Sequence, residues 1–279
     1  MTRRARQRRV LLSSLVLLIS TLACRGGDGE SIEVPQGAPV VLISIDTLRA
    51  DRLPAYGYAS VDTPALARLQ SDGIVFDRAY SHVPFTLPSH TSILTGLLPT
   101  EHGLRDTIGY KLDTEAVPFL PKIFQRLDYA VGAAVSAYVL NAGTGLGEGW
   151  DFYEDQVQVL AGRDLGGLQR RGDDTLELAI DWLDSVDDRP FFLFFHIYEP
   201  HTPYEAPEPF ASRYDNPYDA EVAAADDIVG RLLEELHRRD LYDPSIIFLL
   251  SDHGEGLMDH GDPEHSLFVY REVLQVPLI

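Results

Sequence analysis

A hydroxyl residue stands just ahead of a predicted helix in the stretch Thr86–Gly96, which reads TLPSHTSILTG. Pro88 suits a first helical turn, where the N–H that proline lacks would have no partner in any case. Gly96 can end the helix in the left-handed conformation. Because the free N–H groups and the dipole of a helix start attract phosphate or sulfate, this pattern points Thr86 at the phosphorus or sulfur atom of an ester. The alternative is an ordinary capping threonine, since Thr followed by Pro opens many helices.

Three apolar runs each end in residues that can bind a metal. They are Val40–Ile45 before Asp46, Phe191–Phe195 before His196 and His201, and Ile246–Leu250 before Ser251, Asp252, His253, Gly254 and Glu255. Continuous β-branched and aromatic runs predict strands that are buried on both faces, as in a parallel sheet. Ligands of open α/β sheets bind beyond the carboxyl ends of the strands, so we expect these polar residues to meet at one edge.

Each of these residues also has an ordinary structural explanation. Asp46 could cap a turn, His196 could be a core histidine, and His201 could belong to a rigid loop. The segment Asp252–Gly254 could be a polar turn in which glycine supplies a positive φ. Taken together, these explanations require several coincidences at three strand ends, and a buried Asp–His pair is costly without a cation or hydrogen-bonding partners.

Other polar residues near these motifs are less informative. Asp259, His260 and Asp262 fit a solvated acidic loop better than a metal site. For Glu255 and His265 the sequence leaves a loop role and a functional role open, because loops held by a rigid scaffold often carry function.

Four stretches hold these residues in order: VVLISIDTLRADRLPAYGY at 40–58, PFTLPSHTSILTGLLPTEHG at 84–103, FFHIYEPHTPYEAP at 194–207 and SDHGEGLMDHGDPEH at 251–265. Together they resemble the sulfatase-like family of the alkaline phosphatase superfamily. The resemblance implies a three-layer α/β domain with a mostly parallel central sheet. Relatives continue beyond the point that corresponds to Ile279, so we expect the C-terminal part of the fold to be missing.

The resemblance also implies site roles. Asp46, Asp252 and His253 would ligate a divalent metal, with Thr86 as both ligand and nucleophile. His196 and His201 stand where relatives bind a second metal or the oxygens of the substrate. His90 and His265 would contact the substrate. A metal would help Thr86, because an unassisted hydroxyl is a poor nucleophile.

The chain departs from the sulfatase pattern at several positions. Sulfatases carry Cys or Ser, which is oxidised to formylglycine, at the position of Thr86, and Arg at that of His90. They often place a second carboxylate where this chain has Thr47, and a downstream lysine has no clear counterpart in residues 130–150. Threonine cannot become that aldehyde, and threonine nucleophiles are typical of the superfamily's phosphodiesterases and head-group transferases. The resemblance therefore implies sulfatase ancestry with phosphoryl-type chemistry.

Three functions are compatible with these residues. The first is a metal-dependent hydrolase of phosphate or sulfate esters. The second is a phosphoethanolamine or phosphoglycerol head-group transferase, although such transferases have several membrane spans ahead of the catalytic domain. The third is a non-catalytic remnant that binds metal or anions.

Carboxylate, imidazole and hydroxyl ligands favour zinc or manganese, with calcium as an alternative and one or two ions bound. The partner we expect is an anionic ester, linked to a glycan or a lipid. A net charge of −20 over 279 residues argues against nucleic acid, which binds basic surfaces. Neither the oligomeric state nor the exact substrate follows from the sequence.

The N-terminus predicts export. Five arginines fall within residues 3–9, and the mainly apolar segment 10–23 is too short for a comfortable membrane span but suits a signal peptide. Cys24, the only cysteine, stands where a bacterial lipoprotein is cleaved and acylated, although ordinary cleavage or an uncleaved anchor is also compatible. We therefore expect an export segment at 1–24, a flexible tether at 25–38 and a catalytic domain at 39–279, in the periplasm or cell envelope.

The remaining pattern alternates between strand and helix. It predicts helices over 63–72, 116–127, 173–183 and 221–237, strands over 74–80 and 129–136, and irregular structure over 141–172. Such alternation implies right-handed crossovers in a layered α/β domain.

Overall fold

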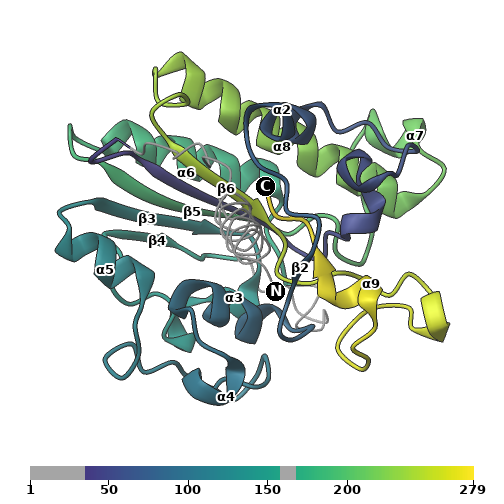
Figure 1. Ribbon diagram of the computed structural model, residues 1–279, viewed down its shortest axis with the longest axis horizontal. Coiled ribbons are helices and arrows are strands. Elements are labelled where there is room, and N and C mark those ends of the chain that lie inside the picture. The colour runs from purple at the N-terminus through teal and green to yellow at the C-terminus, as the bar shows by residue number, and fades with distance from the viewer. Residues whose placement is uncertain (1–34, 158–167) are drawn as a thin grey trace, which may run out of the picture. The chain divides into compact units, whose positions relative to one another are not determined.

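The computed structural model describes residues 35–157 and 168–279, and its centre is a parallel β-sheet (Figure 1). The five strands are β1 (Val40–Ile45), β3 (Ala130–Val135), β4 (Phe152–Glu154), β5 (Phe191–Ile197) and β6 (Ile246–Leu250), and they lie in the order β4-β3-β5-β1-β6. All four pairings in this sheet are parallel, which confirms the predicted sheet type.

Helices cover both faces of the sheet. The longer ones are α2 (Pro64–Asp72), α3 (Thr86–Thr95), α5 (Leu120–Arg126), α6 (Gly172–Ser185) and α8 (Pro217–Arg238). Short helices are α4 (Pro99–His102), α7 (Phe210–Arg213) and α9 (Arg271–Leu274), and a small antiparallel pair joins β2 (Ala79–Tyr80) to β7 (Gln275–Val276). In Figure 1, α2, α6 and α8 lie on one face and α3 and α5 on the other, so the predicted three-layer α/β architecture is confirmed.

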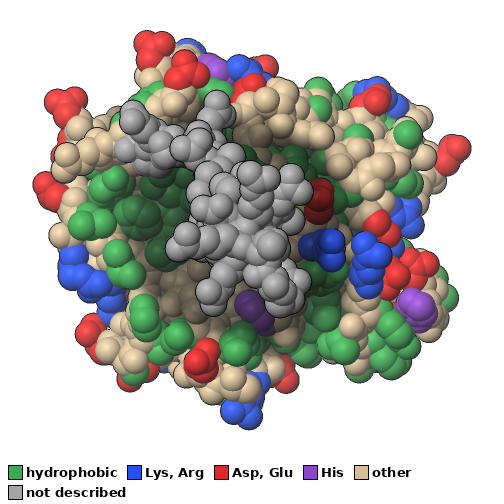
Figure 2. Space-filling view, in the orientation of Figure 1, with side chains coloured by type: hydrophobic (Ala, Val, Ile, Leu, Met, Phe, Trp, Pro, Cys, Tyr) green, Lys and Arg blue, Asp and Glu red, His purple; other side chains and the backbone are tan. Residues whose placement is uncertain are grey.

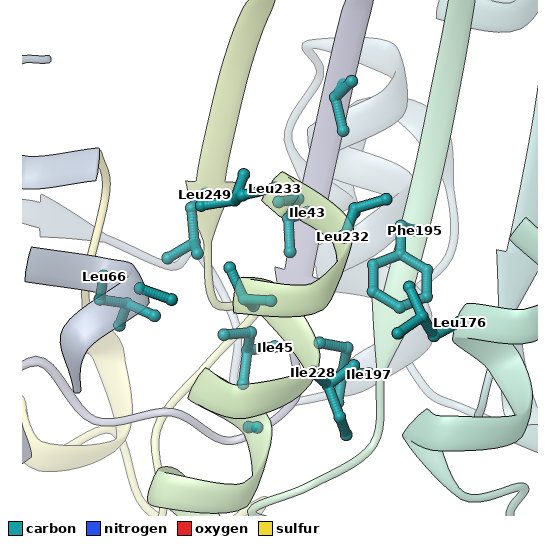
Figure 3. Packing of buried hydrophobic residues seen from close by; sticks show 14 of the residues in the cluster. Ile43, Ile45, Leu66, Leu176, Phe195, Ile197, Ile228, Leu232, Leu233 and Leu249 are labelled. Atoms are coloured by element: carbon teal, nitrogen blue, oxygen red, sulfur yellow. The ribbon is translucent and has the colours of Figure 1, made fainter. Parts of the chain in front are cut away.

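Strand side chains alternate between two cores, one for each face of the sheet. Ile43, Phe195 and Ile197 pack with residues of α2, α6 and α8, among them Leu66, Leu176 and Leu232 (Figure 3). On the opposite face, Leu42, Phe192 and Phe194 pack with residues such as Leu87 and Leu94 of α3. Because both faces are covered, the central strands β1 and β5 are apolar except at Ser44 and His196, near their carboxyl ends.

Several element bounds differ from the sequence prediction. The helix predicted over 116–127 starts only at Leu120, because Pro118 disfavours helical backbone in the residue before it. The strand predicted over 74–80 is reduced to Ala79–Tyr80. Within the segment predicted to be irregular, β4 forms because its backbone pairs with the edge of β3, from Gly132 opposite Phe152 onward. Such a pairing has no local sequence pattern.

The N-terminal predictions fall mostly outside the described residues. The export segment, Cys24 and residues 25–34 of the tether are not described, and neither are residues 158–167. Among the described residues, none of the helices combines the length and the hydrophobicity that crossing a bilayer requires.

Candidate active site

Two neighbouring strands deliver the candidate metal ligands. Asp46 directly follows β1, and Asp252 and His253 follow β6 after one residue. β1 and β6 are parallel neighbours in register, with Ser44 opposite Leu250, so their carboxyl ends lie side by side. Residues that are more than 200 positions apart therefore meet at one edge, as the sequence predicted.

The third contribution comes from the start of α3. Thr86 is the first residue of this helix, and Gly96 ends it with a φ of 70° in the left-handed region, as predicted. Ser89 in the first turn donates a hydrogen bond of 2.7 Å to the carbonyl oxygen of Asp252, which ties the helix start to the ligand loop. The Thr86 hydroxyl lies 3.3 Å from Nε2 of His253.

Asp46, Asp252 and His253 offer ligand atoms that lie within 4.8 Å of one another, and all three side chains are buried. Nδ1 of His253 donates to the carbonyl oxygen of Gly254 over 3.0 Å, so the lone pair of Nε2 faces the two carboxylates. Nε2 is 3.2 Å from Oδ2 of Asp252 and 3.9 Å from Oδ1 of Asp46.

These carboxylates lack the hydrogen bonds that buried charges need. Both carboxylate oxygens of Asp46 and Oδ2 of Asp252 are buried without a hydrogen-bond partner. A buried, unpaired carboxylate costs several kcal/mol, and two in contact also repel each other. A divalent cation between them would satisfy all three oxygens, so the donor set fits a metal ion.

The electrostatics of the cluster agree with this fit. Burial, followed by the charges of Asp252 and Glu255, raises the pKa of Asp46 well above its usual value. For Asp252, burial raises the pKa, but the neighbouring His253, His90 and His196 outweigh it, and the net shift is downward. Burial lowers the pKa of His253 to about 4, which keeps its imidazole neutral and able to ligate a metal.

His196 and His90 lie behind these ligands. Nδ1 of His196 accepts a hydrogen bond of 3.3 Å from the backbone N–H of Ser136, so its Nε2 carries the proton in the neutral ring and lies 3.4 Å from Oδ2 of Asp46. His90 donates from Nδ1 to the carbonyl oxygen of Thr86 and accepts at Nε2 from the Ser44 hydroxyl, each over 2.8 Å. Both ring nitrogens of His90 are thus occupied by protein groups, a geometry that favours positioning over the substrate contact that the resemblance implies.

A pocket of about 110 Å³ opens directly at Thr86. Its lining also includes His201 and His265, with Phe85, Tyr138, Val139, Leu168 and Tyr198 as apolar and aromatic walls. Nδ1 of His201 donates to the carbonyl oxygen of Thr202 over 2.6 Å, and Nδ1 of His265 lies 3.1 Å from Oε1 of the buried Glu255. The rings of His253 and His265 are 4.4 Å apart, so the pocket and the metal ligands form one continuous site.

The pKa values of the two pocket histidines, His201 and His265, are shifted in opposite directions. Burial and the neighbouring His265 lower the pKa of His201 to about 4. Burial alone would also lower the pKa of His265, but the hydrogen bond and the charge of Glu255 outweigh it and raise the pKa above its usual value. One imidazole is therefore adapted to accept a hydrogen bond, and the other to hold a proton.

Two backbone features at the site differ from the sequence expectation. Gly254 does not supply a positive φ. Instead, a Cβ there would lie 2.0 Å from the carbonyl oxygen of Glu272, so the close approach of these two chain segments requires glycine. The left-handed residue is Thr47, with a φ of 53°, which is strained for a β-branched side chain. The N–H of Thr47 lies 3.3 Å from Oδ1 of Asp252. The strained residue therefore lies where the segment of Asp46 contacts the segment of Asp252.

The structure brings all eight predicted site residues to one edge of the sheet. Two further buried residues, Glu255 and Arg49, lie beside them. Glu255, for which two roles were open, is fully buried against His265. Arg49 has no signal in the sequence, because its contacts with residues 255–259 lie over 200 positions away and leave no local pattern. In the acidic loop, Asp259 and His260 are exposed as expected, whereas Asp262 is buried.

Comparison with known proteins agrees with this arrangement. The sulfatase family model matches residues 39–279. Human N-acetylgalactosamine-6-sulfatase is 25% identical over 270 residues, which cover 80% of this chain and 51% of the human protein. Among solved structures, yidJ of Bacteroides fragilis has a TM-score of 0.74 at 21% identity, covering 90% of this chain and 69% of that one. Phosphonate monoester hydrolase of Agrobacterium radiobacter has a TM-score of 0.71 at 18% identity, covering 86% and 67%.

This chain spans about half the length of the curated relatives it matches. The solved structures share its fold at low identity, and the family model covers nearly all of the described residues. On this evidence, the chain belongs to the sulfatase family of the alkaline phosphatase superfamily.

Proposed function

We propose that this protein is a metal-dependent hydrolase of sulfate or phosphate esters, with Thr86 as the nucleophile. The observation that carries the proposal is the Thr86 hydroxyl at a helix start, 3.3 Å from Nε2 of His253 and beside two buried carboxylates with unpaired oxygens. The free N–H groups of the first turn favour the anionic group of an ester in the same place.

Asp46, Asp252, His253 and Thr86 would hold the ion. Two carboxylates, one imidazole and one hydroxyl suit zinc or manganese, and calcium remains compatible with the oxygen ligands. When bound, the ion would lower the pKa of the Thr86 hydroxyl and offset the negative charge of the reacting ester oxygens.

The chain's own residues then account for both halves of the reaction. Thr86, having lost its proton to water, attacks the sulfur or phosphorus with Oγ1, and the bond to the alcohol oxygen breaks. His265 gives a proton from Nε2 to that leaving oxygen, and the alcohol departs. In the second half His265 takes a proton from water, whose oxygen displaces Oγ1 and releases sulfate or phosphate.

His265 suits this role because Glu255 binds its Nδ1 and so fixes Nε2 as the atom available to the pocket. His201, also on the pocket wall, presents the lone pair of its Nε2 and would accept a hydrogen bond from a hydroxyl group of the substrate. We assign His196 and His90 to the support of Asp46 and of the helix start, respectively.

Two observations favour different esters as the substrate. The names of the relatives favour a sulfate ester, and those that act on N-acetylgalactosamine 6-sulfate suggest a glycan-linked one. The Thr86 side chain favours a phosphate ester, since threonine cannot supply the formylglycine of the usual sulfatase. We further propose export to the cell envelope, with Cys24 as a candidate lipid anchor.

The test is metal content together with turnover. The chain from residue 25 would be purified and its bound metal quantified. Sulfate, phosphate monoester and phosphodiester of 4-nitrophenol would be assayed in parallel, with and without an added alcohol acceptor. Stoichiometric metal with turnover of any one ester in water would support the proposal, and the preferred ester would fix the chemistry.

Contrary results would separate the alternatives. Turnover only in the presence of an acceptor would indicate a transferase. Metal binding without turnover of these esters or of sulfated and phosphorylated sugars would indicate a binding remnant, and the absence of metal binding would refute the proposed site.

A further inference from the structure

Arg49 has the most extensive set of contacts near the site, although it touches neither a ligand side chain nor the pocket. It lies three residues after Asp46, and its side chain is only 2% exposed. Buried arginines are rare unless their guanidinium donors are paired, so the partners of Arg49 indicate what it is there to hold.

The guanidinium of Arg49 contacts two separate chain segments. Toward its own segment, Nε and one terminal nitrogen donate to the two carboxylate oxygens of Asp51, over 2.9 and 2.8 Å. Toward the other segment, the second terminal nitrogen donates to Oδ2 of Asp259 over 2.8 Å and to the carbonyl oxygen of Glu255 over 3.1 Å.

These two segments are the ones that supply the metal ligands. Asp46 precedes Arg49 by three residues, and His253 precedes Glu255 by two. Besides Arg49, few side-chain bonds join the segments at this point: the Leu48 N–H donates to the Ser251 hydroxyl over 2.9 Å, and the Thr47 N–H lies 3.3 Å from Oδ1 of Asp252. Thr47 is held in a left-handed conformation, which persists only where the surrounding contacts over-determine it, and the Arg49 bonds are among these contacts.

We propose that Arg49 is a positioning residue that holds the loop of Asp252 and His253 against the loop of Asp46, and so sets the spacing of the metal ligands. This inference rests on the proposed function, because it concerns the same metal site. The clamp extends further, since the carbonyl that Arg49 binds belongs to Glu255, whose carboxylate orients His265.

A contribution to stability alone does not explain this arrangement. Asp51 and Asp259 have side chains that are 58% and 47% exposed, and ion pairs at exposed carboxylates add little to folding free energy. A planar fork that reaches a carboxylate on one side and a carboxylate plus a carbonyl on the other is instead suited to fixing geometry. Lysine, with one compact ammonium group, cannot span both segments.

The experiment measures metal affinity rather than turnover. The Kd for Mn²⁺ and Zn²⁺ would be determined by calorimetry on metal-free wild type, Arg49→Lys and Asp259→Asn. The matched control is Arg52→Lys, because Arg52 lies three residues after Arg49 but its guanidinium pairs with Asp219 and Tyr58 instead of residues 255–259. Urea unfolding in chelator would give the stability of each metal-free variant.

We expect Arg49→Lys to raise the Kd roughly 10- to 100-fold, as the loss of an outer-shell partner typically does. Asp259→Asn should raise it less, and Arg52→Lys should leave it unchanged. A purely structural role would lower the urea midpoint of Arg49→Lys without changing the Kd of the folded chain, and that result would overturn the inference.

Asp259→Asn keeps the test decisive if Arg49→Lys does not fold, because Asp259 is half exposed and lies at the far end of the clamp. An unchanged Kd in that variant would then contradict the proposal. Failure of the wild-type chain to bind either metal would instead refute the proposed function, and with it the site that Arg49 is inferred to position.

Discussion

The direction of each site histidine is set by the hydrogen bond at its Nδ1 atom. In His253 and His201 this atom donates to a backbone carbonyl, so Nε2 presents a lone pair to the carboxylates and to the pocket, respectively. In His196 it accepts from a backbone N–H, so Nε2 presents a proton. The same residue type thus offers a candidate metal ligand, an acceptor and a donor within one site, because the backbone selects the tautomer.

Replacement of Thr86 tests the nucleophile. Thr86→Ala should lower kcat by more than about a thousandfold, since it removes the hydroxyl that lies 3.3 Å from Nε2 of His253. Thr86→Ser, which keeps the hydroxyl, is the matched control and should retain turnover. The measurement is kcat on the preferred nitrophenyl ester, with circular dichroism to confirm folding. A full rate in the alanine variant would show that another group attacks the ester.

Replacement of His265 tests the proton donor. His265→Gln should lower kcat/KM for an alkyl ester by about 10²- to 10⁴-fold, the usual range for a general acid. A 4-nitrophenyl ester should lose far less, because nitrophenolate leaves without a proton. Rates on the two esters would be compared in wild type and variant. Equal losses on both would mean that His265 binds the substrate rather than protonating the leaving group.

At the scale of elements, the candidate site forms because two strands and one helix place the polar residues at their ends close together. β1 and β6 end together, and α3 directs its first turn at the same point through the bond from Ser89 to Asp252. Helix α2 is fixed from outside: the two carboxylate oxygens of Asp226, in α8, accept from the backbone N–H groups of Ala65 and Leu66 over 3.0 and 2.8 Å. A residue of one helix thereby caps the N-terminus of another.

Asp226→Ala should destabilise the protein by about 1–3 kcal/mol, because it leaves two N–H groups at the buried start of α2 without an acceptor. The neighbouring Asp227→Ala is the control, since Asp227 pairs with Arg231 on an exposed helix surface and should change stability by less than about 0.5 kcal/mol. Urea unfolding of the two variants checks this. Equal midpoints would show that Asp226 does not cap α2.

At the scale of the whole molecule, acidic charge is distributed unevenly between surface and core. On the face drawn in Figure 2, Asp and Glu side chains lie mainly around the periphery, in line with a net charge of −20. Asp46, Asp252 and Glu255, in contrast, are almost fully buried at one edge of the sheet. A net negative charge does not attract an anionic ester, so its binding depends on local groups such as the candidate metal ligands and the pocket histidines.

Chelation should destabilise the whole domain. An ion that binds only the folded chain adds about 2.7 kcal/mol at one hundred times its Kd, so its removal should lower Tm by roughly 5–10 °C. Thermal unfolding with saturating Mn²⁺ and with chelator measures this shift. In Asp252→Asn the difference in Tm between metal and chelator should be small, since this variant lacks one proposed metal ligand and its negative charge. A wild-type Tm that does not respond to metal would contradict the site.

The sequence by itself determined the parallel sheet and the layered fold. Continuous apolar runs indicate buried strands, and apolar residues at helical spacing indicate the helices between them, and both patterns are local. It also determined that Asp46, His196 and Asp252 would meet, because parallel strands end at a common edge. Only the tertiary structure decided which ring nitrogen of each histidine faces the site, that His90 is enclosed by Ser44 and Thr86, and that Arg49 joins two segments. Ser44 and His90 are 46 residues apart, Ser136 and His196 are 60 apart, and Arg49 and Glu255 are 206 apart. Pairings that distant depend on how the layers pack rather than on any local pattern.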